Sequence, residues 1–260
     1  MTQDPSPIED YEKSTFSAAL ASGKKVTHDI YQRGSGAPIV LIQELPGIGV
    51  ETLRLADEFV EAGFRVVMPH LFGPIGKVSM VGNIVRVFCM RKEFHLFQAN
   101  RSSPIVDWLK ALCRDIQASH GVNGVGVIGM CLTGNFAISL MADDSVLAAV
   151  ASQPAMPIGK QSALHMSDED IGAIKMGIDA KAPMQAFRFE GDPMCTSAKF
   201  KSIDATFNSE GATRVELHTL PGKQHSVLTL DFVDEDAHPT RQALNNILSY
   251  FQQQLASTKI

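Results

Sequence analysis

The chain has few cysteines and no long apolar run. Its 260 residues include four cysteines, at positions 89, 113, 131 and 195, with no CxxC pair and no histidines at zinc-ligand intervals. This pattern predicts neither a metal site nor a disulfide framework, and it suggests no cofactor. No apolar run approaches the ~18 residues of a membrane span. We therefore expect free thiols and no membrane segment.

Positive charge is also scarce. The chain carries 23 Lys and Arg against 28 Asp and Glu, for a net charge of -5. A nucleic-acid surface needs clustered Lys and Arg in excess, so the composition argues against one. We interpret the cations of "VRVFCMRKEF" as a solvated helix face. The N-terminal stretch "MTQDPSPIEDYEKS" is polar and acidic, the opposite of a signal peptide, so we expect a cytoplasmic protein.

Apolar runs alternate regularly with amphipathic segments along the chain. The runs expected to be strands are 25–34, 38–44, 65–73, 124–130, 146–154, 184–191 and 213–222. The segments with helical spacing are 47–64, 103–119, 132–142 and 238–256. This alternation predicts an α/β fold, with a doubly wound, mainly parallel sheet covered by helices on both faces.

We expect one domain over residues 1–260, without internal repeats or a linker. Residues 1–24 are expected to be a mobile N-terminal arm. Two segments interrupt the strand–helix rhythm: residues 74–103 are a candidate cap over a site, and residues 155–182 are expected to form a helix-bearing excursion.

The segment "GVIGMCLTGNFAISL" predicts a strand that turns into a helix at Cys131. Reactive groups gather at the carboxyl ends of strands in open α/β sheets. A helix N-terminus there stabilises both a thiolate and a developing oxyanion. The turn resembles a nucleophile elbow, with Gly129 two residues before the cysteine, but position +2 is Thr133 and Gly134 follows at +3. A buried structural cysteine is the alternative interpretation.

Two further residues complete a possible triad. An α/β-hydrolase carries its triad in the chain order nucleophile, acid, histidine. Asp192 follows the strand ending in "FRFEG", and His225 follows "RVELHTLPG", so both lie past strand ends on the same sheet edge as Cys131. Taken alone, Asp192 is equally a turn residue before Pro193, and His225 a polar loop residue.

From about residue 36 onward the chain resembles the dienelactone hydrolases (carboxymethylenebutenolidases). The shared marks are "IQELPGI" after the first core strand, "GMCLTG" at the elbow, "EGD" at the acid and "HSV" at the histidine. The resemblance implies about seven or eight strands and a role for Glu44, which would accept the thiol proton when substrate arrives. The expected oxyanion donors are the backbone N–H groups of Leu132 and Leu45.

Three departures from the family pattern concern the elbow and the substrate. Thr133 replaces the +2 glycine. The family binds its substrate carboxylate with arginines, one of them four residues after the histidine, where this chain has Thr229. Arg86 and Arg91 are candidate substrate-binding replacements, with Arg101 as a further option. His70 stands where relatives usually have an aspartate.

The sequence favours a cysteine-dependent hydrolase of small esters, lactones or thioesters. The alternative from another class is a catalytically silent relative that binds a small molecule or a protein. A redox-active thiol ranks last, because no resolving cysteine stands at short spacing. Preferential alkylation of Cys131 would favour the hydrolase, and equal reactivity of all four thiols would favour the silent relative. The natural substrate and oligomeric state stay open.

Overall fold

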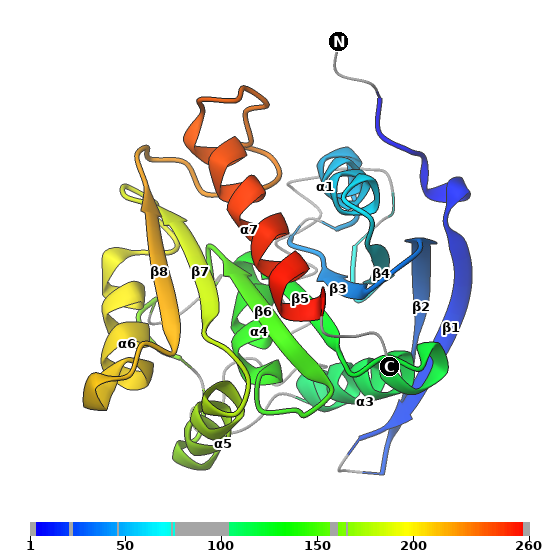
Figure 1. Ribbon diagram of the computed structural model, residues 1–260, viewed down its shortest axis with the longest axis horizontal. Coiled ribbons are helices and arrows are strands. Elements are labelled where there is room, and N and C mark those ends of the chain that lie inside the picture. The colour runs from blue at the N-terminus through cyan, green and yellow to red at the C-terminus, as the bar shows by residue number, and fades with distance from the viewer. Residues whose placement is uncertain are drawn as a thin grey trace.

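An eight-stranded sheet forms the centre of the computed structural model (Figure 1), which describes residues 4–20, 23–45, 47–73, 75, 104–156, 161–164 and 166–256. The strands are β1 (Glu12–Ala19), β2 (Lys25–Gly34), β3 (Pro38–Ile42), β4 (Arg65–Pro69), β5 (Val125–Met130), β6 (Val146–Ser152), β7 (Met184–Phe189) and β8 (Val215–Leu220). Their order across the sheet is β1-β2-β4-β3-β5-β6-β7-β8. From β4 to β8 the neighbours run parallel, whereas β1 and β2 join antiparallel at one edge.

Helices cover both faces of this sheet. The α-helices are α1 (Val50–Glu61), α3 (Pro104–His120), α4 (Gly134–Leu140), α5 (Asp168–Asp179), α6 (Ser197–Phe207) and α7 (Pro239–Leu255). Short 3-10 turns are η1 (Ile8–Asp10), η2 (Cys131–Thr133) and η3 (Ser209–Gly211). Helices α1 and α7 pack on one face, and α3, α4, α5 and α6 pack on the other.

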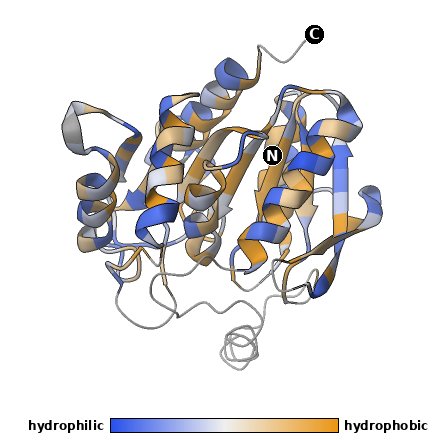
Figure 2. Ribbon diagram, turned by 90° about the horizontal axis from the view of Figure 1, so that it is seen from below, coloured by the Kyte–Doolittle hydropathy of each residue, from blue (hydrophilic) through white to orange (hydrophobic). Residues whose placement is uncertain are grey.

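The central strands are apolar on both sides because each face supports a separate core. In β3, Val40 and Ile42 belong to the core under α3 and α4, while Ile39 and Leu41 belong to the core under α1 and α7. Successive strand residues point to opposite faces, so a strand buried on both sides is a continuous apolar run. Figure 2 shows these hydrophobic strands between the helices.

The predicted single-domain α/β fold with a mainly parallel sheet is confirmed, and one local expectation is wrong. The expected mobile arm is wrong for Glu12–Ala19, which pair along their whole length with β2. This edge strand has solvent on most of its side chains, so it lacks the apolar run that marks a central strand. Helix α6 was also not foreseen, because its apolar stripe is weak. The candidate cap 74–103, apart from Ile75, lies outside the described residues.

Candidate active site

Cys131 sits where β5 gives way to a helix, with a backbone φ of 55°. Such a φ is unfavourable for a residue with a Cβ, and it persists only where the surroundings enforce it. Here the Cys131 carbonyl oxygen accepts the backbone N–H of Ala155 at 3.1 Å, which ties the elbow to the chain after β6. The Cys131 side chain is buried, with 6% of the residue exposed. The elbow predicted at this position is therefore present.

The glycines and the threonine of the elbow each have a definite structural task. A Cβ at Gly129 would lie 2.2 Å from the carbonyl oxygen of Thr133, so only glycine fits before the turn. A Cβ at Gly134 would come within 3.1 Å of Pro154 Cα. The Thr133 hydroxyl accepts the backbone N–H of Met130 at 2.9 Å and lies 3.0 Å from the Ile42 carbonyl oxygen, to which it can donate. Threonine at +2 thus joins β3 to β5, and Gly134 provides the close approach.

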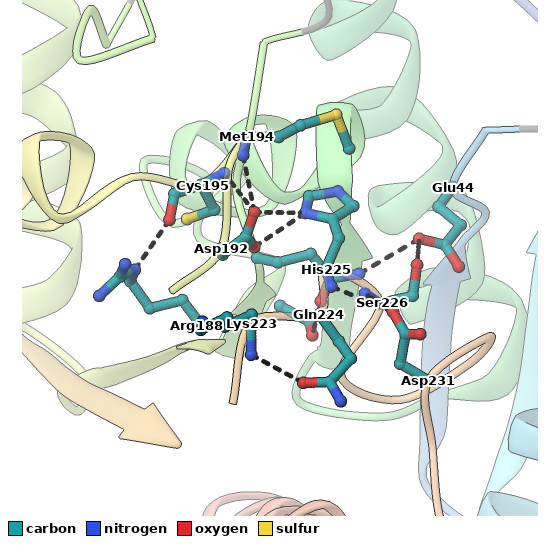
Figure 3. Close-up of polar contacts among 12 residues, drawn as sticks. Glu44, Arg188, Asp192, Met194, Cys195, Lys223, Gln224, His225, Ser226 and Asp231 are labelled. Carbon is teal, nitrogen blue, oxygen red and sulfur yellow. Dashed lines mark hydrogen bonds and ion pairs between the residues drawn. The ribbon is translucent and has the colours of Figure 1, made fainter. Parts of the chain in front are cut away.

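Asp192, which is buried, and His225, which is partly buried, form a pair at the same edge of the sheet. His225 Nδ1 lies 2.8 Å from Asp192 Oδ2 and 3.0 Å from Oδ1 (Figure 3). The Asp192 carboxylate is fully buried, and its Oδ1 also accepts the backbone N–H groups of Met194 (2.8 Å) and Cys195 (2.9 Å). With Nδ1 donating to the carboxylate, Nε2 is the acceptor of the neutral imidazole. That Nε2 is buried and has no hydrogen-bond partner among the described residues.

Two charged residues fix the loops that carry this pair. Asp231 accepts the backbone N–H groups of His225 (3.0 Å) and Ser226 (2.8 Å), so it closes the loop after β8 around the histidine. Arg188 is buried at the end of β7, and its Nε donates to the Cys195 carbonyl oxygen at 2.8 Å (Figure 3). In both loops a charged side chain binds main-chain groups, so the loop positions depend on Asp231 and Arg188.

Glu44 lies beside the elbow because β3 and β5 are paired. Ile42 is in register with Gly129, and Glu44 and Cys131 each follow two residues later. The Glu44 carboxylate is buried and accepts three neutral donors: Ser226 Oγ at 3.2 Å, Gln153 Nε2 at 3.2 Å and the Thr229 hydroxyl. Sequence reasoning expected Glu44 near the cysteine but did not foresee these three partners.

Burial and charge keep the resting thiol protonated. Burial raises the pKa of Cys131 far above its usual value, and the nearby negative charge of Glu44 raises it further. The backbone N–H of Leu132 acts in the opposite direction on the thiol. Burial also raises the pKa of Glu44, although hydrogen bonds from Thr229, Ser226 and Gln153 and the charge of His225 oppose that rise. A free thiolate is therefore not the resting state of this site.

The expected oxyanion donors each directly follow a site residue in the chain. Leu132 follows Cys131 in η2, and Leu45 follows Glu44 in the turn after β3. The candidate arginines Arg86, Arg91 and Arg101 lie outside the described residues. His70 turns its Nε2 to the Gly73 carbonyl oxygen at 2.8 Å, a contact that supports the chain after β4.

A simple sequence signal marks the three partners of Glu44. Gln153 is the first residue after the apolar strand β6, the same kind of position that drew attention to Glu44 and Asp192. Ser226 and Thr229 follow His225 by one and four residues. A polar residue that directly follows a buried parallel strand is thus a site candidate even when its type suggests no chemistry.

Comparisons with known proteins agree with this geometry. The chain matches the dienelactone hydrolase family over residues 29–255. A Klebsiella pneumoniae protein assigned as a dienelactone hydrolase superposes with a TM-score of 0.65 at 15% identity, covering 93% of this chain and 99% of its own. The dienelactone hydrolase-like promiscuous phosphotriesterase P91, from metagenomic libraries, gives 0.63 at 13% identity, covering 93% and 98%.

A cold-adapted esterase from an Arctic intertidal metagenomic library gives a TM-score of 0.56 at 19% identity, with 98% of both chains covered. At these identities the structural likeness bears on the fold alone. No curated protein matches the sequence. Within the described part of the chain, no helix has the length and apolar character needed to cross a membrane. The family match spans most of the sequence, and the chain belongs to the dienelactone hydrolase family, whose members are α/β-hydrolases that act on ester bonds.

Proposed function

We propose that this protein is a cysteine-dependent hydrolase of small, uncharged esters or lactones, acting in the cytoplasm through an acyl-enzyme on Cys131. One observation carries the proposal. The Asp192–His225 pair leaves His225 Nε2 without a partner among the described residues, at the sheet edge where Cys131 occupies its strained turn. A base oriented by a carboxylate, next to a nucleophile on an elbow, is the arrangement that acyl transfer requires.

The catalytic cycle assigns a task to each residue. The Cys131 thiol gives its proton to Glu44 as substrate enters, the role implied by the family resemblance, and the thiolate attacks the ester carbonyl carbon. Backbone N–H groups of Leu132 and Leu45 stabilise the resulting oxyanion. The proton on Glu44 then passes to His225 Nε2, and His225, oriented by Asp192, gives it to the leaving alcohol. A water molecule next loses a proton to His225 Nε2 and attacks the thioester. The tetrahedral intermediate releases the acid and the Cys131 thiolate, which takes that proton back from His225.

The surroundings of Glu44 support an uncharged substrate. Thr229 occupies the position of the family's arginine, and its hydroxyl donates to Glu44. A substrate carboxylate placed here would meet the negative charge of Glu44 and find no guanidinium at this position. The loss of one charged hydrogen bond costs ~1.5–3 kcal/mol, which is roughly a tenfold to more than hundredfold loss in kcat/KM.

A matched set of substrates and variants tests the proposal. We would measure kcat/KM for chromogenic short-chain esters, simple lactones and carboxylated lactones with wild type, Cys131→Ala and Cys113→Ala. Cys113 is a fully buried cysteine of α3, so its variant controls for the loss of a thiol. We expect Cys131→Ala alone to abolish turnover, and neutral substrates to react at least as well as carboxylated ones. Full activity of Cys131→Ala would overturn the nucleophile, and a strong preference for carboxylated lactones would overturn the substrate class.

A further inference from the structure

Gln153 shares an unusual backbone conformation with Cys131. Among the described residues, these two are the non-glycine residues with positive φ, 35° for Gln153 and 55° for Cys131. Each directly follows a central strand, and the last residues of those strands, Met130 and Ser152, are paired in register. Strained residues of this kind cluster at functional sites. Gln153 therefore stands at the active edge of the sheet, one strand away from the elbow.

The backbone of Gln153 is fixed from both sides. Its N–H donates to the Phe187 carbonyl oxygen of β7 at 2.7 Å. Two residues later, the Ala155 N–H donates to the Cys131 carbonyl oxygen at 3.1 Å, and Asn135 Nδ2 donates to the Ala155 carbonyl oxygen at 3.0 Å. The chain after β6 is thus tied to the elbow and to the first turn of α4. These bonds fix the position of the Gln153 Cα, from which the side chain extends.

The carboxamide of Gln153 is fully buried and oriented toward Glu44. Its Nε2 lies 3.2 Å from Glu44 Oε2, and its Oε1 accepts the hydroxyl of Ser152. The reverse orientation would place the amide oxygen against a carboxylate, with no proton between two acceptors. With Glu44 charged, the Gln153 amide is therefore oriented with its NH₂ group toward the carboxylate, as a neutral donor.

Among the donors to Glu44 in the described part of the chain, Gln153 alone lies outside the loop that carries His225. Ser226 and Thr229 both belong to the loop after β8, so their hydrogen bonds to the carboxylate depend on the position of that loop. Gln153 comes from the end of β6, a buried central strand. The titratable groups that act electrostatically with Glu44 are His225, on that loop, and Cys131, at the elbow.

We propose that Gln153 is a positioning residue, which holds the Glu44 carboxylate charged and in place to receive the proton of Cys131. The inference rests on the proposed function, because it needs Glu44 to accept that proton. Burial disfavours the charged carboxylate, and the Gln153 N–H opposes this effect. Without the amide, Glu44 stays protonated up to a higher pH. Below that pH it cannot accept the proton of the Cys131 thiol. The activity lost in this way returns when the pH is raised.

Two variants separate this role from a structural one. Gln153→Asn keeps an amide one methylene too short for Glu44, and Asn tolerates positive φ better than most residues. Gln153→Met keeps the length and removes the donor. Gln185→Asn is the matched control, since buried Gln185 on β7 donates to Glu216 at 3.1 Å outside this site. The measurement is kcat/KM against pH for a neutral chromogenic ester, with the melting temperature of each variant.

We expect the acidic limb of the profile to move upward by about one pH unit in both Gln153 variants, so that activity below the limb falls about tenfold and the plateau is kept. Gln185→Asn leaves the limb in place. The double variant Glu44→Gln/Gln153→Asn should match Glu44→Gln alone, because the two residues act through one contact. An unmoved limb, or an equal fall at every pH, would overturn the inference. Cys131→Ala measured in parallel distinguishes the failures: an active Cys131→Ala refutes the proposed function, whereas an inactive one with an unmoved limb refutes only the role of Gln153.

Discussion

Replacing Asp192 by Asn should disable the imidazole while leaving the fold intact. The Asp192 Oδ1 accepts two backbone N–H groups, from Met194 and Cys195, and Oδ2 faces His225 Nδ1. An Asn side chain has one acceptor oxygen and one donor NH₂ group to occupy the positions of Oδ1 and Oδ2. With its oxygen at Oδ1 it keeps both backbone bonds, and its NH₂ group then faces His225 Nδ1. The imidazole must accept there and carry its proton on Nε2, so Nε2 becomes a donor.

The alternative orientation sets the size of the effect. If the Asn oxygen faces His225, the NH₂ group faces the N–H groups of partly buried Met194 and buried Cys195, and both donors lose their acceptor. Each unsatisfied buried group costs ~1–3 kcal/mol. The productive tautomer is therefore disfavoured by about 2–6 kcal/mol, which lowers kcat roughly 30-fold to 25,000-fold.

The assay is kcat for a chromogenic ester, together with the melting temperature and ¹⁵N NMR of the His225 ring. Asp179→Asn, which changes an exposed acid paired with Arg214 away from this site, is the matched control. We expect the ring proton on Nδ1 in wild type and on Nε2 in Asp192→Asn, with a near-native melting temperature. A folded Asp192→Asn variant that keeps more than a third of wild-type kcat would refute this reasoning.

Three further predictions follow from the same contacts. His225→Ala removes the only imidazole paired with Asp192 in the described site, so kcat should fall by orders of magnitude while circular dichroism stays native; near-normal turnover would show that the histidine is misassigned. Glu44→Gln removes the proton acceptor of the thiol, so stopped-flow kinetics should show slower acylation with little change in substrate affinity; unchanged acylation would leave Glu44 a structural acid. Lys199 is fully buried, with Nζ bonded to the Ala163 carbonyl oxygen at 2.7 Å, and burial lowers its pKa from 10.5 to about 8. The unfolded chain binds this proton more tightly, so between these two values stability rises with pH, and below pH 8 the buried charge costs about 3 kcal/mol. Lys199→Met should therefore raise the free energy of unfolding at pH 7 and lose this advantage above pH 10; an equal effect at both pH values in denaturant titrations would count against this explanation.

The sequence was sufficient to predict which strand ends carry the site residues. Buried parallel strands are continuous apolar runs, and their carboxyl ends meet at one edge, so Cys131, Asp192 and His225 could be placed there from their positions. Glu44 was added by the resemblance to the dienelactone hydrolases. The strand 25–34 was predicted with the bounds that β2 has. These features depend on local patterning and on the topology that it imposes.

What the sequence could not supply depends on contacts between distant segments. The three hydrogen bonds to Glu44 come from residues that lie 109, 182 and 185 positions away from it in the chain. No local sequence pattern predicts that these residues meet. Strand β1 escaped notice because an edge strand with solvent on most of its side chains has no apolar alternation. The replacement of the family's arginine by Thr229 was visible, but its hydroxyl bond to Glu44 emerged only from the fold.

The nucleophilic role of Cys131 can be tested by trapping the acyl-enzyme. A slow ester substrate is mixed with enzyme, quenched in acid within milliseconds to seconds, and digested for mass spectrometry. The account predicts the acyl mass on the peptide containing Cys131, formed at the rate of the burst phase, absent in Cys131→Ala and unchanged in Cys113→Ala. An acyl group on another residue, or full turnover by Cys131→Ala, would contradict it.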